Sequence, residues 1–413
     1  MRIILIYQYF LSDNEPGHTR WNEMTKMWAD SGNQITVIAG MINYNTGKRN
    51  KKYKNKLFFK ENYHNNVNVI RCHVSNSYNK NFLGRLWAYF SFVFFGLFAA
   101  LFKTKGQHDA IVVSSPPLFV GIIGLFIKKI RKIPMIFEIR DLWPESAVET
   151  GVVKNKYIIK ISYWLEKYIY DNSILLNVLT PAFKKHLVDK KDIPIDKIIY
   201  IPNAADFNLM KKYDNFNRND FRADLGWDGK FVIIYVGAHG VANNLLQLLD
   251  AAKKLEGSKA HIVLIGDGME KEYLIDYSKK NNLDNVEFLD PIPKIEVIKY
   301  ILASDAGTSV LKKNDVFKTI YSNKTFDYMI CKKPILMGID GASRDLVSLA
   351  KAGFFVEPEN PESFAINARK LMNNKKECIQ MGQNGYDYAK QYFHREKLAR
   401  KYLELINNRL DNK

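Results

Sequence analysis

The sequence is poor in cysteine, with only Cys72, Cys331 and Cys378 among its 413 residues. These three lie far apart, so they lack the close pairing of a zinc site, and an odd number cannot all form disulfides. We therefore expect reduced core cysteines in a cytosolic protein. We also expect no secretion leader, because Met1 and Arg2 run directly into an apolar segment typical of a strand.

Two nucleotide-binding patterns are missing as well. No G-x-G-x-x-G follows any strand-like segment, and no G-x-x-x-x-G-K-S/T occurs in the chain. These absences argue against a dinucleotide-dependent dehydrogenase and a P-loop nucleotidase. The composition, 47% hydrophobic and 25% charged, is that of an ordinary globular protein. The chain is too long for one core, so we expect two domains of about 200 residues each.

Acidic residues are scarce in the first half of the chain, where 15 stand against 29 basic residues up to position 200. The whole chain has a net charge of +18, and its basic residues are densest at 48–56 and 128–132. Such a charge attracts nucleic acid or an anionic membrane, and a basic surface that serves only solubility is a third interpretation. No helix-turn-helix, zinc-finger or RNA-binding signature occurs, which favours the membrane.

One uncharged run, 86–102, is rich in aromatic residues and has a basic residue on each side. Its length reaches only the lower limit for a membrane span. A span here would place the two halves of one sheet on opposite sides of a bilayer. We expect instead a helix packed by one face on the sheet, with Trp87, Phe90 and Phe94 partly offered to lipid. A fully buried helix is the alternative.

Short apolar segments alternate with helix-length segments along the chain, which is typical of parallel sheets covered on both faces. We expect an α/β protein with Rossmann-like domains at 1–205 and 225–413, a linker at 206–224, and ligands in a cleft between the carboxyl ends of the two sheets. The last helices, about 361–407, would close the second domain and could cross back to the first. The predicted strands are Ile3–Tyr7, Gln34–Ala39, Val67–Cys72, Ala110–Val113, Met135–Ile139, Ile174–Val178, Ile198–Ile201, Phe231–Val236, His261–Ile265, Val286–Leu289, Ala306–Val310, Pro334–Met337 and Phe354–Val356.

The segment 321–329 is the most informative one in the chain. Ser322 or Asn323 would cap a helix whose first amides and partial positive charge favour an anion. Lys324 adds a full cation there. Asp327, one turn after Asn323, would hold the two cis hydroxyls of a ribose with its acceptor oxygens. An anion site and a diol site one turn apart suit a nucleoside diphosphate, although an ordinary surface helix can begin in the same way.

A run of Arg-Asp-Leu-Trp-Pro-Glu-Ser at 140–146 is the most specific motif of the chain. Weaker motifs accompany it at 15–20, 114–117, 201–204, 235–240, 264–268 and 322–329. Together they resemble the retaining GT-B glycosyltransferases of the glycogen-synthase-like family 4, over nearly the whole chain. Within that family the chain looks like the bacterial branch that builds O-antigen and capsule, which includes N-acetylfucosamine transferases.

The resemblance implies a GT-B fold, with two Rossmann-like domains facing each other across a cleft, and it implies roles for individual residues. Gly17, after the first strand, would let the backbone approach the donor phosphates, and Arg20 would touch them. Lys324 and the amides beside it would take the diphosphate, and Asp327 the ribose. The other donor-binding residues implied are Gly237, Gly266, Asp267, Gly268, Ser322, Asn323 and Ile292, whose backbone would pair with the edge of the base.

The chain departs from the family pattern near the diphosphate. Many relatives have an arginine and a lysine after the first strand of the second domain, where this chain has Ala238 and Asn243, with His239 and Asn244 beside them. Of the family's pair of glutamates only the later one has an acidic counterpart here, and the earlier position falls at 318 or 319. We take His239 and Asn243 as further donor contacts.

Four cations are predicted to replace the missing ones: Lys318, Lys324, Arg20 and Arg140. Arg140 stands where the first domain of relatives often has a histidine. Asp141 and Glu145 follow the strand predicted at 135–139 and would orient the acceptor hydroxyl or assist in its deprotonation. A structural ion pair is the alternative interpretation for Arg140 and Glu145.

The resemblance implies retention of the anomeric configuration by front-face attack, in which an oxygen of the leaving phosphate takes the acceptor proton. Cations and amides at 322–324 would stabilise the departing diphosphate. No metal and no cofactor are expected. The Asp-x-Asp signature of metal-bridging glycosyltransferases is absent and the histidines are scattered.

We therefore predict a glycosyltransferase that moves a sugar, such as an N-acetylated amino or deoxyamino sugar, from a UDP-sugar to a polyprenyl-diphosphate-linked acceptor in cell-surface polysaccharide synthesis. It would be cytoplasmic and peripheral on the inner face of the cytoplasmic membrane, with an anionic membrane surface rather than nucleic acid as partner. Two alternatives stay open: a nucleotide-sugar 2-epimerase of the same architecture, and a non-catalytic basic scaffold or nucleic-acid-binding protein.

Overall fold

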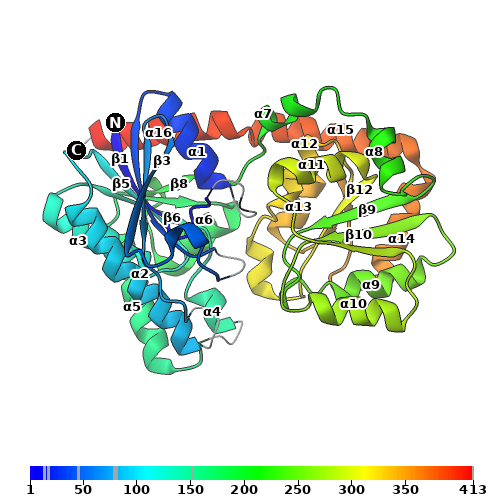
Figure 1. The fold of residues 1–413 in the computed structure, drawn as a ribbon, viewed down its shortest axis with the longest axis horizontal. Helices are drawn as coiled ribbons and strands as arrows, with labels where there is room; N and C mark the ends of the chain where they lie inside the picture. Colours follow the sequence, from blue (N-terminus) through cyan, green and yellow to red (C-terminus); the bar gives the residue numbers. More distant parts are fainter. Residues whose placement is uncertain (13–14, 16–18, 44–46, 78–81, 150–152, 412–413) are drawn as a thin grey trace. The chain divides into compact units, whose positions relative to one another are not determined.

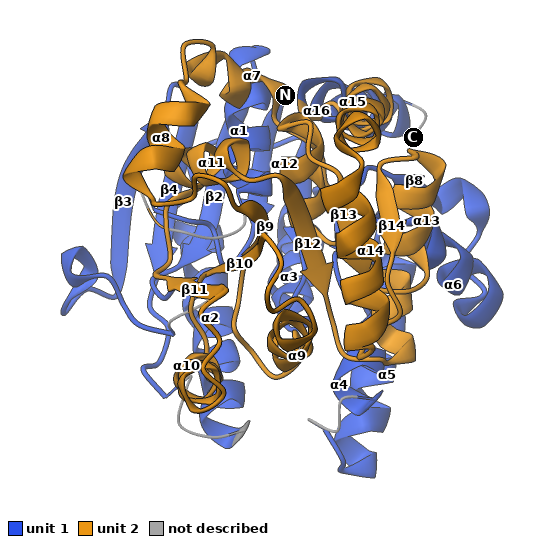
Figure 2. Ribbon diagram, turned by 90° about the vertical axis from the view of Figure 1, so that its right-hand side faces the viewer, with its two compact units in different colours: residues 1–13, 17–202, 396–413 blue, residues 14–16, 203–395 orange. Residues whose placement is uncertain are grey.

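The computed structural model describes residues 1–12, 15, 19–43, 47–77, 82–149 and 153–411. They fold into two compact units, drawn in blue and orange in Figure 2. Unit 1 comprises residues 1–13, 17–202 and 396–413, and unit 2 comprises 14–16 and 203–395. Each unit has its own sheet with helices on both faces, so the predicted pair of Rossmann-like α/β domains is confirmed.

Unit 1 is built on eight strands in the order β3-β4-β2-β1-β5-β6-β7-β8. Every neighbouring pair is parallel except β3 and β4. The order β4-β2-β1-β5-β6-β7 is doubly wound, and the chain reverses direction across the sheet between β1 and β5. The strands are β1 (Arg2–Ile6), β2 (Gln34–Gly40), β3 (Phe58–His64), β4 (Val67–Cys72), β5 (Ala110–Ser114), β6 (Met135–Ile139), β7 (Leu175–Val178) and β8 (Ile198–Tyr200).

All seven strands predicted for the first half are present, and the sequence analysis missed only β3. This strand pairs antiparallel with β4 at the edge of the sheet. Its residues are half-buried or exposed, because an edge strand here is not covered on both faces as the central strands are. Its polar composition therefore lacks the continuous apolar run by which the other strands were identified.

Two helices far apart in the sequence, α1 (Arg20–Asp30) and α16 (Arg395–Asp411), cover one face of this sheet (Figure 1). Trp21 and Trp28 of α1 are fully buried and pack with Tyr402 of α16 at ring-centroid distances of 6.2 and 5.5 Å. The indole of Trp28 also donates a hydrogen bond to the carbonyl of Ala399, 2.9 Å away. The C-terminal helix therefore belongs to the core of unit 1 and crosses back to the first domain, as the sequence analysis allowed. The bound of 413 predicted for the second domain is too long.

The opposite face of the sheet is covered by α2 (Phe82–Phe102), α3 (Val120–Arg131) and α5 (Lys156–Asn172) (Figure 1). α2 packs by one face, on which Ala88, Phe92 and Ala99 are fully buried, whereas Trp87 is 63% and Phe94 68% exposed. The alternative of a fully buried helix is therefore wrong. By length and composition α2 is the one helix of the described residues that could cross a membrane, but its buried face is part of the core of unit 1.

The remaining helical segments of unit 1 are short and lie in the connections between strands. Thr180 caps one of them by accepting a hydrogen bond from the amide of Phe183, with Pro181 at its first position. They are η1 (Lys51–Tyr53), α4 (Glu145–Glu149), α6 (Pro181–Lys191) and η2 (Ile195–Lys197).

Unit 2 has six parallel strands in the order β11-β10-β9-β12-β13-β14, the doubly wound order of a Rossmann fold. The chain reverses direction across this sheet between β9 and β12. All six strands predicted for the second half are present. They are β9 (Phe231–Val236), β10 (Ala260–Ile265), β11 (Val286–Leu289), β12 (Ala306–Val310), β13 (Ile335–Gly338) and β14 (Gly353–Phe355).

Helices cover both faces of the unit 2 sheet, with α9, α10 and α14 on one side and α11, α12, α13 and α15 on the other (Figure 1). Each connection brings the chain back to the amino end of the next parallel strand, so the loops after the strands gather at one edge. The helical segments are α7 (Phe207–Met210), η3 (Lys211–Tyr213), α8 (Arg218–Asp224), α9 (Leu246–Lys254), α10 (Lys271–Lys280), α11 (Lys294–Ala303), η4 (Asp315–Thr319), α12 (Lys324–Ile330), α13 (Ala342–Leu349), α14 (Pro361–Asn373) and α15 (Lys375–Tyr392).

The segment 206–224, predicted as a linker, instead forms α7, η3 and α8 of unit 2. Phe207, Tyr213 and Phe221 pack against the core of that unit. Arg222 donates to the carbonyl of Ala303 and pairs with the Asp305 carboxylate. Scattered aromatic residues thus hold the segment 206–224 against the core of unit 2. The segment has few aliphatic residues, so its sequence does not indicate that it belongs to a domain.

Candidate active site

In unit 2, β9 and β12 separate at their carboxyl ends, where a Rossmann fold places its ligand. They pair only at Ile233 with Ala306 and at Ile234 with Gly307. Tyr328 of α12 fills the gap beyond these pairs. Its hydroxyl donates to the carbonyls of Thr308 and Ile234, at 3.0 and 3.2 Å, and accepts from the amide of Val236.

Glycines let the chain segments approach each other closely at this edge. Gly237 and Gly266 follow β9 and β10 and have φ angles of +154° and +151°. A Cβ atom on Gly266 would lie 1.8 Å from the carbonyl oxygen of Gly237, and one on Gly268 would lie 2.4 Å from that of His239. No side chain fits in either place, so the three predicted glycines fix the shape of this edge through close packing.

His239 is completely buried behind these glycines. Its amide donates to the carbonyl of Asp267, while neither ring nitrogen has a hydrogen-bond partner among the described residues. Burial, with a smaller contribution from the positive charge of Lys271, lowers the imidazole pKa to about 4. His239 is therefore neutral at physiological pH, and it does not supply a cation for a diphosphate.

Lys324 is the cation that stands at the carboxyl end of β9. Its ammonium lies 4.4 Å from the ring centroid of Tyr235, and a Cβ atom on Gly237 would be only 3.3 Å from it. Burial lowers its pKa to about 8, with a small opposing effect of Asp327. Within the described part of the chain Lys324 forms no ion pair, so its charge is available to an anion.

The residues around Lys324 differ from prediction in their local contacts. Neither Ser322 nor Asn323 caps α12 with its side chain. The Ser322 hydroxyl lies 2.6 Å from that of Ser309, and the Asn323 side chain accepts a hydrogen bond from Asn203. These contacts join the start of α12 to β12 and to the segment that enters unit 2, so the capping prediction is wrong.

Asp327 lies one turn into α12, half-buried, with one carboxylate oxygen 3.5 Å from the ammonium of Lys294. Lys318, predicted as a substitute cation, is 46% exposed and paired with Asp315 at 2.7 Å. Its charge is thereby partly neutralised by its neighbour, unlike that of Lys324. Lys294 was not identified from the sequence, because lysine at a helix start gives no specific signal.

Three predicted donor contacts lie in loops that follow the strands. Asp267 is exposed and accepts a hydrogen bond from the amide of Gly268 at 2.8 Å. Asn243 is half-buried in the turn that leads to α9, and its amide donates to the carbonyl of Gly240. Ile292 is half-buried, with its side chain against the core of unit 2. These loops belong to the edge that holds Gly237 and Lys324.

In unit 1, Arg20 forms a buried ion pair with Glu138, whose side chain is fully buried in β6. The guanidinium also donates to the carbonyls of Ile201 and Pro202. Asn177 and Ser114 donate to the same carboxylate at 2.9 and 3.0 Å. Arg20 is 4% exposed, and its N–H groups are bonded to Glu138 and to the two carbonyls. It therefore stabilises the sheet and does not fit the predicted contact with the phosphates of the sugar donor. The other predicted residue of this region, Gly17, lies outside the described residues.

Arg140 and Asp141 follow β6 at the carboxyl edge of the unit 1 sheet. Arg140 donates to the hydroxyl of Tyr7 at 2.6 Å and stacks over its ring, which places it beside the end of β1. Asp141 accepts a hydrogen bond from Ser146 at 2.9 Å. Burial raises the pKa of the Asp141 carboxyl, and nearby Glu145 raises it further, against the opposing effect of the Ser146 bond. A raised pKa makes this carboxylate a better proton acceptor.

Glu145 begins α4 and forms an ion pair with Lys191, with the His186 ring 3.4 Å away. Burial opposes its ionisation, but the neighbouring His186 ring and Lys191 ammonium outweigh that effect and lower its pKa. Lys191 also pairs with the buried Glu166 at 2.6 Å. The structural ion pair weighed for Glu145 is thus present, and Asp141 is the stronger candidate for acceptor chemistry.

Besides Lys294, sequence reasoning missed three residues that shape the two sites: Glu138, Tyr235 and Tyr328. Glu138 did carry a signal, since a lone charge within a buried apolar strand requires a buried partner. The two tyrosines are fully buried, and nothing in the sequence distinguishes them from ordinary core aromatics. Within the described residues no group of three or more histidine, cysteine, aspartate or glutamate side chains has the arrangement of a metal site.

Comparison with known proteins places this geometry in a family. Residues 217–388 match the family of glycosyl transferases group 1, and residues 17–204 match the glycosyl transferase 4-like domain. A putative colanic acid biosynthesis glycosyl transferase of Escherichia coli, WcaI, is 19% identical over 413 residues, 98% of this chain and 99% of its own length.

Two solved structures share the fold. Sucrose-phosphate synthase from Thermosynechococcus elongatus has a TM-score of 0.77 at 15% identity and covers 100% of both chains. HepE of Anabaena, solved in complex with UDP-glucose, has a TM-score of 0.73 at 17% identity, over 99% of this chain and 100% of its own. The two family matches together span most of the sequence and divide it near the boundary of the two units. The chain is therefore a GT-B glycosyltransferase, in which a glycosyl transferase 4-like domain precedes a domain of glycosyl transferases group 1.

Proposed function

We propose that the protein transfers a sugar from a UDP-sugar, bound by unit 2, to a polyprenyl-diphosphate-linked acceptor during the synthesis of a cell-surface polysaccharide. The transferred sugar would be an N-acetylated amino or deoxyamino sugar. Anomeric configuration would be retained, and no metal or cofactor would take part. The enzyme would work at the inner face of the cytoplasmic membrane.

The observation that carries the donor half of this proposal is Lys324. It places an ammonium that has no ion-pair partner among the described residues at the point where β9 and β12 separate, beside the close approach of Gly237 and Gly266. A diphosphate there would contact the Lys324 ammonium. It would also contact the backbone of the glycines, which have no side chain to cover it. Asp327 lies one turn along the same helix and pairs with Lys294. When the donor binds, the ribose hydroxyls would replace Lys294 as partners of this carboxylate. HepE, which shares the fold, was solved with UDP and with UDP-glucose.

Asp141 supports the acceptor half of the proposal. It lies at the carboxyl edge of the unit 1 sheet with a raised pKa, suited to orienting a hydroxyl and accepting its hydrogen bond. The positive groups of unit 2 would stabilise the departing diphosphate, the role that a metal serves in other transferases. WcaI, similar along its whole length, is named for a part in colanic acid synthesis, which supports a polysaccharide product.

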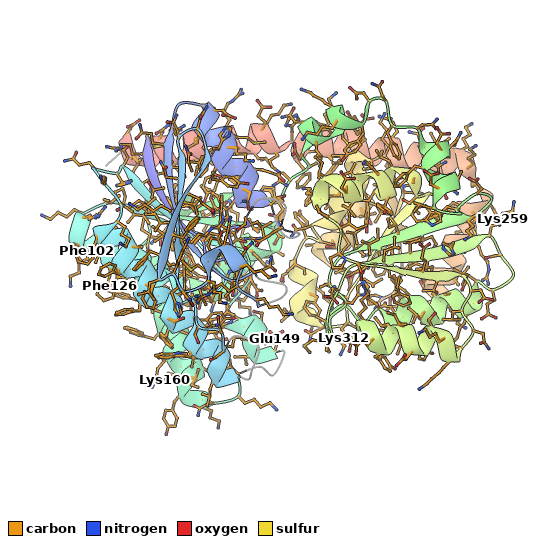
Figure 3. The ribbon with its side chains drawn as sticks, viewed as in Figure 1. Phe102, Phe126, Glu149, Lys160, Lys259 and Lys312 are labelled. Carbon is orange, nitrogen blue, oxygen red and sulfur yellow. The ribbon has the colours of Figure 1, made fainter. Side chains whose placement is uncertain are left out.

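Calorimetry of UDP binding tests the donor site. Replacing Lys324 with methionine keeps the length of the side chain and removes its charge, so the Kd for UDP should rise by about tenfold to a hundredfold. Lys259 offers a matched control. It is exposed and precedes β10, at the opposite edge of the same sheet, and Lys259→Met should leave the Kd unchanged (Figure 3).

Absence of UDP binding by the unaltered protein, or equal binding by Lys324→Met, would contradict the proposed donor site. Transfer to a lipid-linked acceptor should also persist in EDTA. A strict requirement for Mg²⁺ or Mn²⁺ would overturn the metal-independent part of the proposal and leave the donor site standing.

A further inference from the structure

The largest exposed apolar side chains of unit 1 gather on three helices, α2, α3 and α5. On α2 and α5 they recur every third or fourth residue, which places them along one side of each helix. Eight of them are more than half exposed, and six of these define what we call the three-helix face: Trp87, Phe94 and Phe102 of α2, Ile130 of α3, and Ile161 and Trp164 of α5.

Close packing joins these helices into one surface. A Cβ atom on Gly96 of α2 would lie 2.8 Å from the side chain of Ile123 on α3. A Cβ atom on Gly121 of α3 would lie 2.3 Å from Ile169 on α5. The two glycines therefore let α3 pack tightly against both neighbours, and the three helices lie side by side (Figure 1). Phe102 and Phe126 point outward from α2 and α3 (Figure 3).

The charges around this face have one predominant sign. Between residues 82 and 135 the chain has seven basic residues and a single acidic one, Asp109. The two acidic residues of α5 are both paired with lysines, Glu166 with Lys191 and Asp171 with Lys167. An apolar surface with exposed aromatic residues and a basic surround matches an anionic lipid surface, where such rings lie at the level of the headgroups. Two copies of so basic a face would repel each other.

We infer that the three-helix face rests on an anionic lipid bilayer, with its aromatic side chains among the headgroups and its lysines beside the lipid phosphates. This surface is broader than the single helix expected from the sequence, since α5 contributes two of its six defining residues. It also continues toward the acceptor residues. The ring of Phe90 on α2 lies 5.0 Å from Phe119, which lies 5.6 Å from Trp143, two residues after Asp141.

The aromatic path from Phe90 to Trp143 would lead a lipid-linked acceptor from the bilayer to Asp141. This part of the inference rests on the proposed function, whereas bilayer binding stands without it. Flotation of the full chain with vesicles tests the bilayer binding. The protein should float with vesicles that contain phosphatidylglycerol and about tenfold less with phosphatidylcholine alone, because each lysine near an anionic surface adds to the attraction.

Two double variants test which helices bind. Trp87→Ser with Phe94→Ser on α2, and Ile161→Ser with Trp164→Ser on α5, should each lower partitioning by about tenfold or more. Leu349→Ser with Ile379→Ser is the matched control, since these residues of unit 2 are 70% and 63% exposed. It should float like the unaltered protein. Equal flotation of the α5 variant and the unaltered protein would overturn the inference.

Fluorescence gives a direct reading of contact. Trp87 and Trp164 are each 63% exposed, Trp143 is half-buried, and Trp21, Trp28 and Trp227 are fully buried, so brominated lipid should quench Trp87 and Trp164 most strongly. Trp87→Phe with Trp164→Phe should remove most of this quenching and still float. A dimer in sedimentation that the α2 variant dissociates, without any flotation, would show that a second copy covers the face and overturn the inference.

UDP binding separates this inference from the proposed function. Both serine variants change only unit 1 and should bind UDP with unchanged affinity. Loss of flotation with intact UDP binding therefore bears on the bilayer alone. Absence of UDP binding in a protein that floats would count against the donor site instead.

Discussion

Lys324 and Arg20 are both cations that the sequence assigned to the donor phosphates, yet their surroundings differ. Arg20 donates to a buried carboxylate and to two backbone carbonyls, so its charge is neutralised inside unit 1. Lys324 has no such partner in the described residues, and burial lowers its pKa to about 8. A cation kept without a partner destabilises the folded protein at neutral pH, which is characteristic of a binding residue rather than a structural one.

The pH dependence of UDP binding should follow from this lysine. Its free pKa of about 8 lies below the ordinary value, so the ammonium loses its proton as the pH rises through 8. A bound diphosphate favours the charged form and raises that pKa, so the Kd should increase by about tenfold per pH unit above 8 until the bound pKa is reached. Calorimetry between pH 7 and 10 measures this.

Lys324→Met is the control for the pH series and should show a Kd independent of pH in that range. Tyr235 has its pKa raised by burial, and His239 titrates near pH 4, so neither neighbour changes charge there. The pH dependence of folding stability has the opposite sign to that of UDP affinity. The unfolded chain holds the Lys324 proton up to its higher, ordinary pKa, so this residue makes the protein more stable as pH rises above 8.

At the scale of secondary-structure elements, strands were the most predictable part of the fold. Central parallel strands are buried on both faces, and β6, for instance, is apolar at every position except Glu138. The edge strand β3 and the helices at 206–224 escaped prediction because their apolar residues are sparse and become buried only through tertiary packing. The roles of Tyr328 and Arg20 escaped for the same reason, since their partners lie far away in sequence.

Glu138 joins β6 to α1, β5 and β7 through Arg20, Ser114 and Asn177. Glu138→Gln keeps the shape but removes the negative charge, which leaves the buried guanidinium uncompensated. We expect a loss of about 3–5 kcal/mol in the unfolding free energy of unit 1, measured by urea denaturation.

Glu149→Gln in the same unit is the control, because Glu149 is exposed at the end of α4, and it should change stability by less than about 0.5 kcal/mol (Figure 3). In the double variant with Arg20→Met the two losses should be less than additive, because the substituted partners interact directly. Additive losses would show that the ion pair contributes nothing.

At the scale of the whole molecule, the chain does not divide into two domains at a single point. Unit 1 includes the last helix, which follows the whole of unit 2 in the sequence. Trp21, Trp28 and Tyr402 form one buried aromatic cluster from the two ends of the chain. Unit 1 therefore completes its core only after synthesis of the entire chain.

Tyr402→Ala tests the contribution of α16 to unit 1. The substitution removes a fully buried ring, and we expect a cost of about 3–5 kcal/mol to unit 1. Hydrogen exchange should then quicken in peptides of α1 and α16 and stay unchanged in peptides from the sheet of unit 2. Tyr392→Ala, which alters a 52% exposed ring of α15, is the control and should leave exchange in unit 1 unaltered. Equal exchange in the two variants would mean that α16 is dispensable for this core.

Tyr328 joins β9 and β12 beyond their last paired residues, with hydrogen bonds to both strands. The ring is a covalent part of the polypeptide and cannot leave it. The spacing of the two strands at this edge is consequently set by the protein's own side chain, which stays in place from one catalytic cycle to the next.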